Sequence, residues 1–158
     1  MFREMLRKKQ ALTEPECKES LINEKRGVLS VIGDEGYPYG FPINHYYNKK
    51  DGCIYFHCGK VGHKLDALKN CGKVSFCVYD KGYKKDGFWA LNIKSVIVFG
   101  KAEVISDSDT VAEISRNLSY KFTDDDSYID KEISKFLKNT LLIKLTPEHI
   151  SGKLVNES

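Results

Sequence analysis

The chain has 158 residues, of which 41% are hydrophobic and 30% charged, a composition typical of one globular domain in water. Its net charge of +3 comes from interleaved positive and negative residues, so the sequence lacks the basic stripe expected of a nucleic-acid binder. No apolar run is long enough to span a bilayer, and no apolar stretch follows the charged first ten residues as in a secretory signal, so we expect a cytoplasmic protein with no membrane partner.

The cysteines do not have the spacing of a known disulfide pattern. There are five of them, an odd number, and no two have the CxxC spacing. Three lie in strand-like contexts, where cysteine usually acts as a small buried hydrophobe. A disulfide scaffold is therefore not expected.

The first predicted element is a helix. Thr13 and Glu16 have the spacing of a capping box, and the helix is expected to end at Gly27. Residues 27–33 then predict a short apolar strand, and residues 34–38 a tight turn.

A hairpin and a second helix are predicted next. From Tyr39 to Tyr46 aromatic and aliphatic residues alternate with others, as in a half-buried strand. A turn at residues 48–52 leads into a strand over Cys53–Cys58, so these two strands are expected to pair. Residues 62–70 predict a helix with Leu65 and Leu68 one turn apart.

The second half of the chain predicts further strands and two amphipathic helices. Residues 73–80 predict a strand with Val74, Phe76 and Val78 on one face, and residues 88–105 predict one bent strand or two, with a bulge or bend at Gly100. Apolar residues recur at helical spacing in two later stretches. They are Val111, Ile114 and Leu118 in the first, and Ile129, Ile133, Phe136 and Leu137 in the second.

A last strand is predicted over residues 139–147, followed by a polar tail, of which we expect residues 151–158 to be mobile. Hairpin-linked strands with helices at the ends predict one α+β domain, mainly β, built as a small closed antiparallel barrel. Its parts are an N-terminal helical segment (1–26), the barrel core (27–106), the helices (107–139), and the last strand and tail (140–158).

The stretch YFHCGKVGHKL, residues 55–65, carries the chemistry-bearing side chains. His57, Cys58 and His63 could bind a metal, but only His45 is available as a fourth ligand and the spacing fits no structural zinc motif. Cys58 and His63, oriented by Asp66, could instead form a nucleophilic pair.

A third interpretation is an anion site. Gly59 and Gly62 allow the backbone to turn and approach a ligand closely. His63 and Lys64 fall in the first turn of a helix, where cations are unfavourable unless an anion binds to the free N–H groups. The alternative is a solvated lysine and a surface histidine.

Four stretches together resemble the pyridoxamine-phosphate-oxidase-like FMN-binding split barrels, most closely their nitroimidazole-resistance (Nim-type) branch. They are YPYGFPINHYY, DGCIYFHCGKVGHKLDALKN, KVSFCV and SVIVFGKAEVI. The resemblance implies a six-stranded antiparallel split barrel with Greek-key topology and peripheral helices. It also implies a homodimer that holds FMN between its subunits.

The resemblance implies a role for each part of the site. His63 and Lys64, after Gly62, match the basic pair that holds the FMN phosphate, and Trp89 would cap the ring from the partner unless it is a core residue. His57 is the candidate catalytic residue, as a proton donor or only as a space filler. The other implied site residues are Phe41, Pro42, Ile43 and Asn44 along the ring, His57 and Cys58 beside the ribityl chain, and Ser95 and Val96 on the later strand.

The chain departs from true oxidases of this family. They use a Ser–Arg pair in this loop and a C-terminal arginine stretch, whereas Arg116 is the only arginine after Arg26 here. The resemblance therefore implies an FMN oxidoreductase that passes electrons from a nicotinamide-type donor to a small acceptor such as a nitroimidazole. The alternatives are a non-catalytic flavin or haem protein of the stress type, with His45 or His57 as the axial ligand, and an empty barrel acting as a scaffold.

Overall fold

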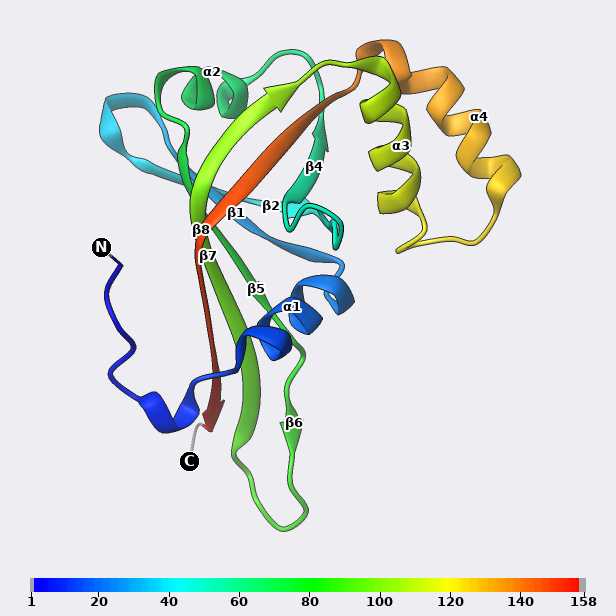
Figure 1. The fold of residues 1–158 in the computed structure, drawn as a ribbon. Helices are drawn as coiled ribbons and strands as arrows, with labels where there is room; N and C mark the ends of the chain where they lie inside the picture. The colour runs from blue at the N-terminus through cyan, green and yellow to red at the C-terminus, as the bar shows by residue number, and fades with distance from the viewer. Residues whose placement is uncertain (1, 157–158) are drawn as a thin grey trace.

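A computed structural model describes residues 2–156, in which one antiparallel sheet curls into a barrel with helices around it (Figure 1). The sheet has eight strands in the order β2-β1-β5-β7-β8-β4-β3, with β6 pairing β7. The strands are β1 Arg26–Ile32, β2 Pro38–Asn44, β3 Tyr46–Tyr47, β4 Ile54–Cys58, β5 Lys73–Tyr79, β6 Tyr83–Lys84, β7 Leu91–Ile105 and β8 Leu141–Asn156.

The curl of the sheet follows from its strand order. The strands at the two ends of that order, β2 and β3, are separated in the chain only by His45. One stretch of chain therefore pairs with β1 at one end of the sheet and with β4 at the other. The predicted mainly-β split barrel is confirmed. In addition to the six expected strands, the sheet contains the two-residue strands β3 and β6.

In the described part of the chain, four α-helices surround the sheet: α1 Glu14–Asn23, α2 His63–Asn70, α3 Ser108–Ser119 and α4 Asp126–Phe136. The capping box before α1 is present, since the main-chain N–H of Thr13 donates to Glu16 Oε2 at 2.7 Å. This helix ends at Asn23 and not at the predicted Gly27, because Arg26 and Gly27 already pair with β2. α3 and α4 lie together at one end of the barrel (Figure 1).

Alternating side chains fill the barrel core. In β5 the predicted inward residues Val74, Phe76 and Val78 are all buried, and the ring edge of Phe76 meets Phe56 of β4. A second apolar cluster lies under α3, where Val111 and Ile114 pack with Tyr55 and Leu142, among others.

The long strand β7 is continuous but changes register at the predicted position. Its pairing with β8 shifts between Phe99 and Gly100. A side chain at Gly100 would collide with the main-chain oxygen of Thr146, so glycine allows the two strands to cross closely there.

Two sequence predictions about the strands are wrong. Residues 151–156 of the predicted mobile tail belong to the second half of β8 and pair with β7, and residues 157 and 158 of that tail lie outside the described residues. The predicted hairpin is made only by β3 and β4, while β2 pairs with β1. The reason lies at His45, whose fully buried ring anchors the corner between β2 and β3. Among residues 2–156, no helix is both long and apolar enough to cross a membrane.

Candidate functional site

The first turn of α2 lies against one face of β2. Tyr39 and Phe41 are two residues apart in β2, so their side chains point to the same face. The ring of His63 stacks on Tyr39 with 4.2 Å between centroids, and Lys64 Nζ lies 5.1 Å from the centroid of Phe41. Two consecutive basic residues thus each rest on an aromatic ring.

The loop before α2 is open and ends at a glycine that the backbone requires. Gly62, the N-cap of α2, has a φ of 132°, a conformation that residues with side chains rarely adopt. A Cβ at Gly59 or Gly62 would meet no atom within 4 Å. The main-chain N–H groups of His63 and Lys64 have no hydrogen-bond partner among the described residues, whereas that of Leu65 donates to the carbonyl of Gly62 at 2.9 Å.

The site carries positive charge that nearby carboxylates only partly offset. His63 Nε2 is 3.6 Å from Oδ2 of the exposed Asp34. Among the described residues no carboxylate lies within ion-pair distance of Lys64. A cation–π contact leaves the ammonium charged, so Lys64 can still attract an anion.

His57 and Cys58 end β4 within the electrostatic reach of Lys64. Burial of the imidazole and the positive charge of Lys64 lower the pKa of His57, although the residue as a whole is exposed. Cys58 is only 8% exposed, and burial raises the pKa of its thiol. A raised pKa opposes thiolate formation, so the nucleophilic interpretation of Cys58 loses support.

His45 is not placed to bind a ligand. Its ring is fully buried, with Nε2 2.7 Å from the main-chain oxygen of Leu21 and its edge against Phe76. The proposals that His45 completes a metal site or binds haem are therefore wrong for this conformation. Residues 2–156 contain no cluster of three or more His, Cys, Asp or Glu placed to hold a metal ion.

The remaining predicted residues divide into two groups. Along β2, Pro42 is exposed, Ile43 is buried, and Asn44 accepts a hydrogen bond from Arg26 Nε at 2.9 Å. Ser95 and Val96 lie at the other end of the sheet from α2: Ser95 pairs with Tyr79, whereas α2 leads into the opposite end of β5. Val96 is buried in the core.

Trp89 is not a core residue. Its side chain is 76% exposed in the connection between β6 and β7, which projects from the barrel at the end away from α2 (Figure 1). Within one chain, the structure therefore joins Phe41, His63 and Lys64 but leaves Trp89, Ser95 and Val96 apart from them.

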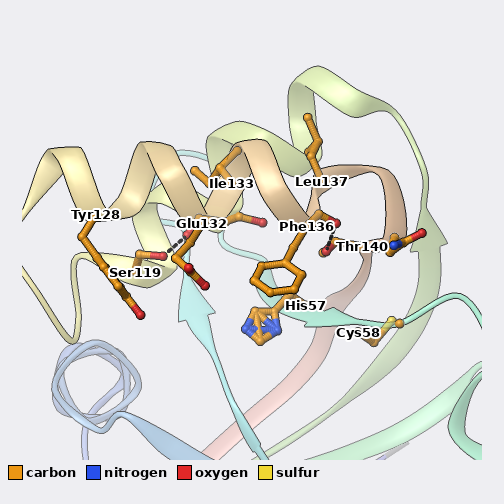
Figure 2. A pocket seen from close by; sticks show the side chains of 12 residues that line it. His57, Cys58, Ser119, Tyr128, Glu132, Ile133, Phe136, Leu137 and Thr140 are labelled. Carbon is orange, nitrogen blue, oxygen red and sulfur yellow. Dashed lines mark hydrogen bonds between the residues drawn. The ribbon is translucent and has the colours of Figure 1, made fainter.

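A cavity of about 460 Å³, the α3–α4 cavity, lies between the end of β4 and the helices (Figure 2). His57, Cys58 and Gly59 form one wall, and Ser115, Ser119, Tyr128, Glu132 and Phe136 contribute to the other. Sequence reasoning missed the polar wall. The sequence feature that could have revealed this wall is the pairs Ser115/Ser119 and Tyr128/Glu132. The members of each pair are four residues apart and therefore lie on one helix face.

The sequence and fold are similar to those of known proteins. A family described as pyridoxamine 5'-phosphate oxidase matches residues 13–154, which is most of the chain. No curated protein matches the sequence.

Three of the similar solved structures indicate the range of proteins with this fold. A Bacteroides thetaiotaomicron protein with a proposed role in 5-nitroimidazole antibiotic resistance is 21% identical, with 92% of this chain and 87% of that chain covered and a TM-score of 0.77. An FAD-binding protein of Mesorhizobium loti is 21% identical (92% and 97% covered, TM-score 0.68). A flavocytochrome of Azotobacter vinelandii is 19% identical (97% and 72% covered, TM-score 0.76). At these identities the likeness establishes the fold.

Proposed function

Because this chain belongs to the pyridoxamine 5'-phosphate oxidase family, we propose that it is a flavoprotein that binds FMN and transfers electrons to a small acceptor. The observation that carries the proposal is the anion site at the start of α2. Lys64 offers a cation without a carboxylate partner among the described residues, and the loop at Gly59 and Gly62 leaves room beside the free N–H groups. These features fit a phosphate group.

The strand β2 supplies a second feature that fits a flavin. It is at one end of the strand order and pairs only with β1, so half of its main-chain groups face away from the sheet. Pro42, which has no N–H to donate, is tolerated in such a strand. The main chain of Phe41, Ile43 and Asn44 would lie along the flavin ring, and its free N–H and C=O groups would orient the ring.

Bound FMN would supply the hydride and electron transfer, and the protein would supply orientation and charge. His57 lies at the edge of the α3–α4 cavity, and its lowered pKa keeps the imidazole neutral near pH 7. A neutral imidazole can donate or accept a proton at a bound substrate. We assign this role to His57, with a nicotinamide-type molecule as the electron donor.

A nitroaromatic is the acceptor that we favour. One protein of the same fold has a proposed role in resistance to 5-nitroimidazole antibiotics. Vitamin B6 phosphate is disfavoured, because the only arginine after Arg26 is Arg116, which is engaged in an ion pair with Asp130.

We further propose that the protein is a homodimer with FMN between its subunits. The anion site and Trp89 lie at opposite ends of one barrel, so a single chain cannot bring them together around one flavin. A second copy, placed in the opposite sense, could bring its Trp89 and Ser95 to the anion site of the first.

The competing function is non-catalytic binding of flavin or haem. A flavocytochrome has the same fold, and His57 is a partly solvent-open candidate for an axial ligand. The absorbance spectrum of the purified protein, with identification of what heat releases, separates these functions. We expect the two broad bands of flavin and about one FMN per chain; a Soret band, or a colourless protein that ignores added FMN, would overturn the proposal.

The phosphate assignment has its own test in the affinity for FMN. Replacing Lys64 by alanine removes the unpaired cation, and loss of a charge-assisted bond should weaken FMN binding about ten-fold or more. Lys69→Ala is the matched control, because Lys69 lies in the last turn of the same helix and pairs with Asp66 at 3.2 Å. Titration of apoprotein with FMN measures both. Equal affinities for the two variants would contradict the assignment.

A further inference from the structure

The α3–α4 cavity adjoins the anion site but differs from it in charge. The two share the segment His57–Gly59, so a molecule in the cavity would lie next to a flavin whose phosphate rests at Lys64. The volume of about 460 Å³ is within the range of small-molecule sites. Its location and size make it a candidate for the acceptor.

The charge of the cavity wall disfavours anionic ligands. Among residues 2–156, no lysine or arginine lines the cavity, and Glu132 is the one carboxylate in its wall. An anionic ligand would meet Glu132 with no lysine or arginine in the lining to offset it, since Lys64 acts on the opposite wall at His57 and Cys58. A cationic or N–H-bearing ligand could instead donate a hydrogen bond to Glu132.

The other lining groups favour a flat ring. The ring of Phe136 is 45% exposed, and it lines the cavity together with the ring of His57 (Figure 2). Deeper in the wall, Ser115 Oγ is buried and has no hydrogen-bond partner among the described residues. Buried hydroxyls are nearly always satisfied, so this oxygen has capacity for a bond to a ligand or to water.

We propose that the α3–α4 cavity binds a flat, uncharged or cationic aromatic molecule whose N–H or amino group donates to Glu132. Phe136 and His57 contact the ring, and Glu132 determines specificity against carboxylates and phosphates. The inference rests on the proposed function in one respect: it takes the molecule bound in the cavity to be the electron acceptor of the flavoprotein.

Three probes of nearly the same shape test the charge preference. Benzamidine, benzamide and benzoate are cationic, neutral and anionic, and their affinities for the full-length protein can be measured by isothermal titration calorimetry. We expect benzamidine to bind most tightly and benzoate most weakly. Glu132→Gln should weaken benzamidine binding about ten-fold and reduce the difference in affinity between the three probes. Glu113→Gln, an exposed residue of α3 outside the cavity, is the matched control and should change nothing.

A second variant covers the case in which Glu132→Gln fails to fold. Phe136→Ala removes an exposed ring at the mouth and should weaken all three probes alike. Benzoate binding as tightly as benzamidine, or a Glu132 variant that behaves like the Glu113 control, would overturn the inference. The flavin spectrum is recorded on the same samples, so the two proposals fail separately: a protein without flavin that still binds benzamidine through Glu132 contradicts only the proposed function.

Discussion

At the scale of single residues, Gly59 and Gly62 separate steric from conformational effects. A side chain at either glycine would meet open space, but only Gly62 has a positive φ, at 132°. We expect Gly62→Ala to cost about 1–3 kcal/mol of unfolding free energy and to weaken FMN binding, because alanine must adopt a strained backbone or shift the start of α2. Gly59→Ala should be close to neutral. Urea denaturation of both variants measures the difference, and equal losses would show that φ at Gly62 is not the determinant.

The residues of the proposed anion site can be selected from the sequence, but their contacts cannot. Gly62, His63 and Lys64 stand out locally, because helix N-termini favour anions over basic residues. Their contacts with Tyr39 and Phe41 depend on α2 lying against β2, which joins segments more than twenty residues apart. No local pattern encodes that pairing. Trp89 shows the same limit, since its residue type suggests a core position and only the fold reveals its exposure.

At the scale of elements, His45 connects α1 to the corner between β2 and β3. Its Nε2 is 2.7 Å from the main-chain oxygen of Leu21, and Lys121 donates to its main-chain oxygen at 2.9 Å. Burial, and secondly the charge of Lys121, lower the pKa of His45 from 6.5 to about 3.

This shift predicts how stability depends on pH. The unfolded chain takes up a proton at His45 near pH 6.5, whereas the folded chain does so only near pH 3, so stability present above pH 6.5 is lost as the pH falls. The loss from this residue should be about 2 kcal/mol between pH 6.5 and pH 5. Urea unfolding at both values should show a smaller loss for His45→Gln than for the natural chain, while His149→Gln should keep the full loss. A His45→Gln protein with an unchanged pH dependence would contradict the prediction.

The other elements could be predicted from the sequence only where a local pattern of apolar residues marks them. The two late helices followed from apolar residues at helical spacing, and β5 from strict alternation. The second half of β8 did not, because residues 148–156 lack a clear apolar period and depend on pairing with β7. The α3–α4 cavity was missed for a related reason: it exists only where two helices and the end of β4 meet.

At the scale of the whole molecule, the strand order places Trp89 and the anion site at opposite ends of one barrel. If the proposed homodimer brings Trp89 of one chain beside the flavin of the other, the only tryptophan of the sequence becomes a reporter of that interface. Trp89 is 76% exposed in the single chain, so its emission should be that of an indole in water when the protein is monomeric.

Adding FMN to the apoprotein should therefore quench the tryptophan emission strongly, in step with FMN binding, under conditions where sedimentation shows a dimer. Dilution to concentrations at which the dimer dissociates should restore the emission and weaken FMN binding together, because each site would lose the residues that the partner supplies. Phe88→Ala, the exposed neighbour of Trp89, should lower FMN affinity through the same interface, whereas Tyr120→Ala, an exposed aromatic residue just after α3, should not. FMN that binds tightly to a monomer, with the emission of Trp89 unchanged, would mean that one barrel completes the site alone.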